Sequence, residues 1–268
     1  MQQIATKHLA ATVLTGVGLE RVASDAPWLW LAAGWRDLWR VPRIGLCYGT
    51  AFAAVSLALA VGLLTTGLAS LTMALAGGFL LIGPLAAVGL YATSQRLEAG
   101  QRVTMSELLK ETRLPAPGQL GFFGAILSFA YIVWLQSAFL LFMLFLGSRP
   151  LPPPSAFVPT LLFTPHGLGL LVTGTAVGGV LAALVFTISV ISVPLLMTRR
   201  IDAVSAMAAS VACVLLNPKP MALWAGLIAG IIVLGVAGLF AGLVIAFPLI
   251  GHATWHAFRQ LVRDEPVG

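Results

Sequence analysis

Long runs of apolar residues, separated by short polar segments, dominate the chain. The runs cover residues 44–65, 69–93, 120–147, 167–197 and 221–258. A helix needs about 20 apolar residues to cross the roughly 30 Å hydrocarbon core of a bilayer, so each of the first four runs fits one crossing. The last run is long enough for two crossings, and Gly235, Gly238 and Gly242 favour a turn near its middle. The pattern therefore predicts six transmembrane helices, at about 44–65, 69–93, 120–147, 167–197, 221–236 and 239–258.

A segment with helical spacing precedes spans one, three and five. These segments cover about 25–42, 104–117 and 202–220, and each begins near a residue typical of helix N-caps and closes at a proline. In the first segment the tryptophans share one stripe, while Arg36, Asp37 and Arg40 lie elsewhere. A helix with tryptophan at its apolar edge and arginine on its polar face lies along a membrane surface. We therefore predict three amphipathic interface helices, the first of them anchored by Trp28, Trp35, Arg36, Trp39 and Arg40.

The composition excludes a water-soluble domain. Apolar residues make up 59% of the chain and charged residues only 9%, whereas a soluble domain carries about 25% charged residues. So few charges cannot cover a surface that faces water. The chain is predicted to be an all-α integral membrane protein.

The distribution of lysine and arginine predicts the orientation. In the six-span arrangement, 14 of the 15 basic residues fall on one side of the membrane, and only Arg149 falls on the other. Short loops rich in lysine and arginine stay in the cytoplasm. We predict a multi-pass protein of the bacterial cytoplasmic (inner) membrane with both termini in the cytoplasm. Its parts are an N-terminal segment (1–24), a membrane domain (25–263) and a short tail (264–268).

Each predicted pair of spans carries a proline followed by leucine in its second span. The three prolines are Pro84, Pro194 and Pro248. A proline removes a helical hydrogen bond and bends the helix, which membranes tolerate where neighbouring helices cover the break. The pattern predicts three related hairpins.

The outer connection, 148–166, contains six prolines. Such a sequence favours an extended, stiff conformation. We expect no folded domain there, and the segment could serve equally as a docking strand for a partner or as a rigid cap over the bundle.

The stretch GHATWHAFR (251–259) holds two of the four histidines, His252 and His256. Four residues apart, both imidazoles lie on one face of a helix, where they can bind zinc or haem if further ligands arrive from elsewhere. The alternative is that they mark the end of a helix at the headgroups, beside Trp255 and Arg259. The second interpretation is favoured, because the sequence offers no convincing further ligands.

The central part of each predicted span lacks ionisable residues, which argues against an ion-coupled pump. Gln136 is a polar residue in the middle of span three. It is the best candidate for a contact with a solute in a pore, although an amide that bridges two helices is the commoner case.

Five stretches of the sequence resemble a known family. They are GWRDLWRVP (34–42), IGPLAAVGLY (82–91), ISVPLLM (191–197), LNPKPMALWAG (216–226) and FPLIGHATWHAFRQLV (247–262). They are similar to the bacterial integral membrane family known as domain of unknown function 2189, from about residue 25 to 263. The resemblance implies a fold and a compartment but no activity.

These observations favour a non-enzymatic protein that serves as an accessory or assembly subunit of a membrane complex. A respiratory complex is one candidate. Its expected partners are the lipid bilayer and another membrane protein or a second copy of itself. Nucleic acid is not expected, because no loop is long enough for a basic folded domain. Two alternatives stay open: a channel or facilitator for a small neutral or lipid-like solute, and a haem- or metal-binding protein that uses His252 and His256.

Overall fold

The protein is helical throughout the part of the chain that the structure describes. The computed structural model describes residues 16–65, 83–105, 117–147 and 154–263, and apart from an isolated antiparallel bridge between Leu19 and Val262 these residues form helices and their connections. The predicted all-α class is confirmed. The chain divides into two compact units: unit 1 contains residues 1–53, 84–123 and 187–268, and unit 2 contains residues 54–83 and 124–186.

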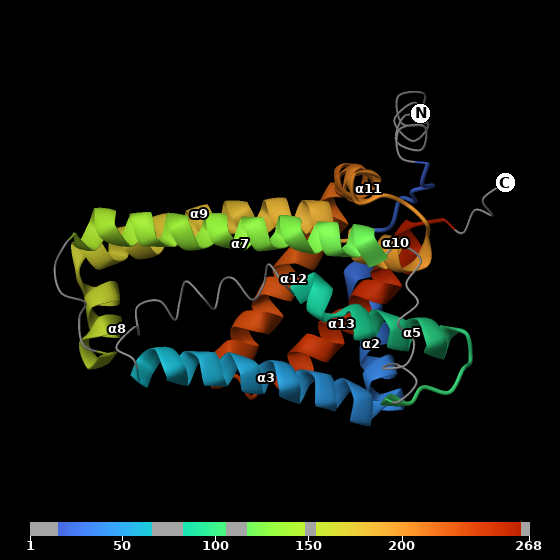
Figure 1. The fold of residues 1–268 in the computed structure, drawn as a ribbon, viewed down its shortest axis with the longest axis horizontal. Coiled ribbons are helices and arrows are strands. Elements are labelled where there is room, and N and C mark those ends of the chain that lie inside the picture. Colours follow the sequence, from blue (N-terminus) through green and yellow to red (C-terminus); the bar gives the residue numbers. More distant parts are fainter. Residues whose placement is uncertain (1–15, 66–82, 106–116, 148–153, 264–268) are drawn as a thin grey trace. The chain divides into compact units, whose positions relative to one another are not determined.

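Unit 1 is built around helix α13. The helices that lie wholly in this unit are α2 (Ala26–Arg40), α5 (Val88–Glu98), α10 (Ser192–Thr198), α11 (Ala203–Leu216), α12 (Pro218–Ala237) and α13 (Leu243–Leu261) (Figure 1). The first half of α3 (Pro42–Thr65) joins them. Helix α13 packs against α2, α5 and α12. A Cβ atom on Gly34 of α2 would lie 2.6 Å from the backbone nitrogen of Ala253, so α2 and α13 can approach this closely only because residue 34 has no side chain.

Several helices begin at a proline. The first residues of α3, α7 (Pro117–Leu146), α8 (Pro154–Phe163), α9 (Pro165–Ser189) and α12 are all prolines. The first helical position has no intrahelical partner for its N–H, and the fixed φ of proline suits it. Pro42 and Pro218, which the sequence suggested as the ends of interface segments, are therefore also the starts of the next helices.

The turn predicted in the last apolar run is confirmed. Helix α12 ends at Ala237 and α13 begins at Leu243. Leu239 and Phe240 adopt positive φ angles of 52° and 66° in the connection. A Cβ atom on Gly242 would lie 2.7 Å from Cα of Gly235, so glycine at both ends of the turn lets the two helices meet closely.

Unit 2 contains α7 and α9 over most of their length, together with α8 and the second half of α3. Helices α7 and α9 pack together where aromatic rings of α7 lie against glycines of α9. A Cβ atom on Gly178, for example, would lie 2.9 Å from the ring of Trp134. Small residues of this kind permit close helix packing in membranes.

The expectation of an extended connection over 148–166 is wrong for residues 154–163. These residues form α8, which includes Pro159. Pro154 occupies the first helical position, where it favours a helix, and the apolar residues that follow continue it. Residues 148–153 lie outside the described part of the chain.

Four helical segments are long and apolar enough to cross a membrane: Pro42–Leu63, Pro117–Leu146, Pro165–Thr198 and Pro218–Ala237. They correspond to predicted spans one, three, four and five. Most of predicted span two falls on residues 66–82, which lie outside the described residues. Helix α13 occupies the position of predicted span six, but it is not among the four segments, and much of it is buried inside unit 1. The six-span count and the three-hairpin repeat remain predictions.

Two of the three predicted interface segments are helices in the structure, α2 and α11. Asp202 caps α11, because its side chain accepts a hydrogen bond from the backbone N–H of Ser205 at 2.9 Å. Most of the middle segment, 104–117, falls outside the described residues.

The described end of the N-terminal segment is attached to the C-terminal part of unit 1. The backbone N–H of Glu20 donates to Leu261 O at 2.8 Å, and that of Arg263 donates to Gly18 O at 2.9 Å. Asn217, at the corner between α11 and α12, accepts from Val22 N and donates to Glu20 O. One amide side chain thus holds two points of this segment.

Candidate functional site

Four polar side chains meet in the interior of unit 1, and we call them the polar seam: Asp37 of α2, Ser94 of α5, and His252 and His256 of α13. The hydroxyl of Ser94 lies 2.9 Å from Oδ2 of Asp37 and 2.7 Å from Nδ1 of His252. Nε2 of His256 lies 2.7 Å from the same Oδ2. The prediction that both histidines share one face of a helix is therefore correct, and three separate helices meet at that face.

The direction of each hydrogen bond follows from the donors available. An ionised carboxylate only accepts, so both Ser94 and His256 donate to Asp37. The single hydroxyl hydrogen of Ser94 is then used, and its oxygen accepts from Nδ1–H of His252. This assigns the proton of His252 to Nδ1 and leaves a lone pair on Nε2.

Asp37 is held in its ionised form. Burial raises the pKa of its carboxyl group, but hydrogen bonds from His256 and Ser94 and electrostatic interactions with the two imidazoles more than offset burial, so the pKa lies below its ordinary value. Nη1 of Arg40 lies 3.6 Å from the other carboxylate oxygen. The seam therefore contains a nearly buried negative charge surrounded by donors from its own chain.

The Nε2 atom of His252 has no hydrogen-bond partner in the described part of the protein, and the ring is fully buried. The Nε2 atom faces Gly45 of α3. A Cβ atom added to Gly45 would lie 3.8 Å from it. One turn further along α3, Gly49 packs directly on the backbone carbonyl of Val244. Pro248 has no N–H to donate to that carbonyl, so glycine at position 49 lets α3 cover the break.

Further polar pairs continue the attachment of α13 on both sides. Glu98 of α5 accepts from Nε1 of Trp255 and from Nε of Arg259, both at 3.0 Å. Trp30 of α2 donates to Oε1 of Gln260 at 2.5 Å. Helix α13 is thus fixed to α2 and to α5 along its C-terminal half, by part-buried hydrogen bonds of the two tryptophans and an exposed one of Arg259.

The structure places His252 inside unit 1, a position that the sequence did not indicate. Its ring is fully buried and hydrogen-bonded to Ser94, because α2 and α5 cover the face of α13 that the sequence left open. His256 is partly exposed and binds Asp37. Each ring has one nitrogen engaged, and among the described residues no group of three or more His, Cys, Asp or Glu side chains is placed to hold a metal ion. Haem or zinc at these histidines remains a prediction.

The predicted anchors of α2 lie on its outer side. Trp28, Trp35 and Trp39 are about half exposed, and Arg36 and Arg40 are exposed beside them. Their role as interface anchors remains a prediction.

Gln136 does not join the seam. It lies on α7, in unit 2, with an exposed side chain. Its role in a pore or between helices remains a prediction.

The three prolines predicted to bend helices have different surroundings. Pro194 follows an interruption at residues 190–191, between α9 and α10. Pro84 lies in a short helical stretch that ends at a turn at Ala87. Pro248 lies inside the continuous helix α13.

Sequence reasoning missed Asp37 and Ser94. Asp37 was grouped with the arginines on the polar side of its segment, yet it shares the inner face with Trp30, Gly34 and Leu38, all of which are buried. The spacing of these three residues could have indicated that face. No signal marked Ser94, because a serine in an apolar segment pairs with α13 only through the tertiary fold.

The fold and the seam together define a helical integral membrane protein in which buried polar residues join three helices. The family model described as "Predicted integral membrane protein (DUF2189)" matches residues 71–198. This confirms the resemblance seen in the sequence, over a shorter stretch than residues 25–263. Neither a curated protein nor a solved structure matches the chain.

Proposed function

We propose that the protein is a non-enzymatic accessory or assembly subunit of a complex in the bacterial cytoplasmic membrane. The observation that carries the proposal is that the acidic groups of the seam region are used by the protein itself. Asp37 accepts from Ser94 and His256, and Glu98 accepts from Trp255 and Arg259. Groups that are bound in this way stabilise helix packing and are not free to act on a substrate.

In this proposal the chain crosses the membrane six times, with both termini in the cytoplasm. The four apolar helical segments and the one-sided distribution of lysine and arginine support it. The second and sixth crossings come from the hydropathy of residues 69–93 and 239–258.

Helices α2 and α11 lie in the plane of the cytoplasmic surface in this arrangement. Both expose large apolar side chains on their outer faces, and the buried residues of α11 are all small. On α11, Val204 and Leu215 are exposed, while Ala206, Ala209 and Cys213 are buried. A helix with this inverted pattern is stable only where lipid or another protein covers its outer face.

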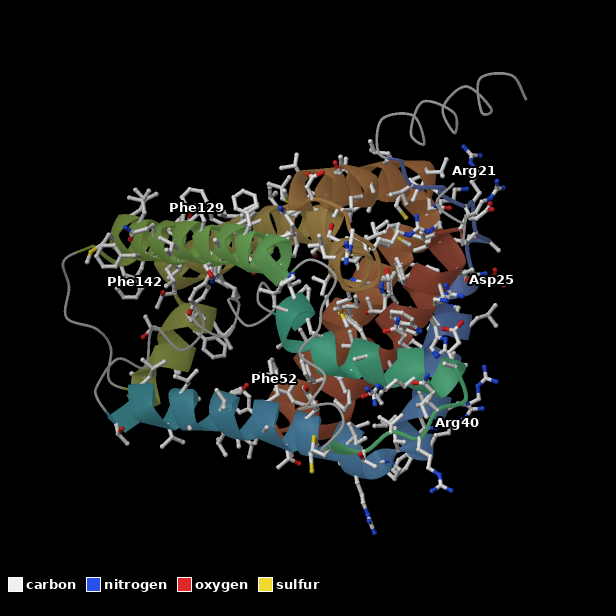
Figure 2. The ribbon with its side chains drawn as sticks, turned by 45° about the vertical axis from the view of Figure 1, so that its right-hand side comes forward. Arg21, Asp25, Arg40, Phe52, Phe129 and Phe142 are labelled. Carbon is white, nitrogen blue, oxygen red and sulfur yellow. The ribbon has the colours of Figure 1, made fainter. Side chains whose placement is uncertain are left out.

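Helix α7 offers the surface for a partner. In the most apolar stretch of 18 residues in this helix, no residue is buried. Phe129, Phe139 and Leu144 are exposed along it, and Phe129 stands out from the helix in Figure 2. Aromatic side chains dominate the energetics of many protein interfaces. The proposal assigns this face to a helix of another membrane protein or of a second copy.

The test is gentle solubilisation of the tagged full-length chain from its native membrane, with mass spectrometry and an absorption spectrum of what co-purifies. We expect a stoichiometric membrane partner, which the triple variant Phe129→Ala/Phe139→Ala/Leu144→Ala loses. The matched control is Val233→Ala/Leu234→Ala, which truncates exposed apolar residues of α12 and should retain the partner. A free monomer at every detergent strength would refute the proposal, and a Soret band would point to haem instead.

A further inference from the structure

Helix α2 has two faces that differ in their contacts. The inner face is fixed to α13: Gly34 packs on Ala253, and Asp37 binds His256. The outer face carries the three tryptophans predicted as anchors, with exposed fractions of 55%, 46% and 49% for Trp28, Trp35 and Trp39. The orientation of α2 is therefore set from inside, and its tryptophans cannot turn inward.

Two arginines accompany the tryptophans on the exposed side. Arg36 donates through Nε to the carbonyl of Ala32 in its own helix at 3.4 Å. Arg40 lies 3.6 Å from Asp37, but its side chain is 62% exposed and projects from α2 in Figure 2. A guanidinium group has five N–H donors, so beyond these contacts both arginines keep donors that can bind an anion outside the protein.

The chain itself brings this face to the membrane. Helix α2 ends at Arg40, and the candidate span Pro42–Leu63 begins two residues later. The two helices run crosswise in Figure 1. If α3 enters the bilayer, the C-terminal half of α2 lies along the surface at the level of the headgroups, where tryptophan and arginine are most stable.

We infer that the outer face of α2 is a binding surface for anionic phospholipid headgroups. Arg36 and Arg40 bind the phosphate groups, and Trp35 and Trp39 insert at the boundary between headgroups and acyl chains. The inference rests on the membrane placement in the proposed function and not on the accessory role, which co-purification tests separately.

The experiment uses the full-length chain in vesicles of phosphatidylcholine alone or of an equal mixture with phosphatidylglycerol. Native mass spectrometry measures which lipid is retained, and lipids brominated near the headgroup quench tryptophan emission. The quenching that disappears in Trp35→Phe/Trp39→Phe belongs to α2. We expect preferential retention of phosphatidylglycerol, weakened about fivefold for each arginine replaced in Arg36→Gln and Arg40→Gln.

Arg102→Gln is the matched control, because it removes an exposed arginine outside α2 and should leave retention unchanged. An equal loss in this control would show that only the overall charge attracts the lipid, which would overturn the inference. Quenching of Trp35 and Trp39 by aqueous iodide and not by brominated lipid would also overturn it, since the face would then be open to water.

Discussion

The replacement Ser94→Ala tests the polar seam most directly. Ser94 lies between Asp37 and His252, at 2.9 Å and 2.7 Å, and it is fully buried. Alanine keeps the backbone and most of the volume, and it removes only the hydroxyl group. Any effect therefore reports the hydrogen bonds and not packing.

The expected cost follows from the groups left behind. The buried Nδ1–H of His252 loses its acceptor, which costs about 1–3 kcal/mol. The carboxylate of Asp37 loses one charge-assisted hydrogen bond, of about 1.5–3 kcal/mol, but keeps the one from His256. Taking the lower part of both ranges, we expect a loss of about 3 kcal/mol, more than about a hundredfold in the folding equilibrium.

The assay is thermal unfolding of the purified protein in mild detergent, followed by tryptophan emission. A loss of this size lowers the apparent Tm by about 6–12 °C for a chain of this length. Ser128→Ala is the matched control, because its exposed hydroxyl donates to the carbonyl of Gly124 in its own helix. We expect a change of less than about 0.5 kcal/mol there, as for most surface substitutions.

A second variant separates the cost of the orphaned N–H of His252 from the cost of the hydrogen bond that Asp37 loses. In Ser94→Ala/His252→Leu the orphaned N–H is absent, so the double variant should be more stable than Ser94→Ala alone. The reasoning is refuted if Ser94→Ala unfolds at the same temperature as Ser128→Ala. It is also refuted if the double variant recovers nothing.

Three further predictions concern other contacts of unit 1. Gly49→Ala drives a methyl group into the carbonyl of Val244, and thermal unfolding should show a loss of about 1–3 kcal/mol. The pKa of Asp37 lies below its ordinary value in the folded protein, so its ionised form adds stability above the ordinary carboxyl pKa of about 3.9. This stability is lost as the pH falls through the lowered value, and Asp37→Asn should flatten the fall of Tm in acid. Asn217→Ala removes the anchor of the N-terminal segment, and residues 16–22 should exchange their amide hydrogens faster.

Each of these predictions has a clear contrary result. A Gly49→Ala protein as stable as the parent would mean that α3 does not approach α13 at this point. An unchanged acid dependence in Asp37→Asn would assign that dependence to another group. Unchanged exchange in Asn217→Ala would show that the backbone pairing with Leu261 and Arg263 suffices without the side chain.

The helices were predictable because lipid restricts the possible sequences so strongly. A membrane span must be apolar over its whole length, so α3, α7, α9 and α12 are visible as runs without any tertiary information. Helix starts and the turn at 238–242 depend on local chemistry, on prolines and glycines, and were also accessible. The helix α8 was missed because prolines favour both helix starts and extended chains.

The sequence by itself determined that this is a helical membrane protein, that its last apolar run turns back near Gly238, and that His252 and His256 share one helix face. It could not show what covers that face. Asp37 and Ser94 lie 57 residues apart in the chain, and Ser94 and His252 lie 158 apart. Hydropathy and periodicity describe each helix alone, whereas a buried hydrogen-bond network depends on which helices meet and at what height. The fold settles this where Gly34 and Gly49 let α2 and α3 approach α13.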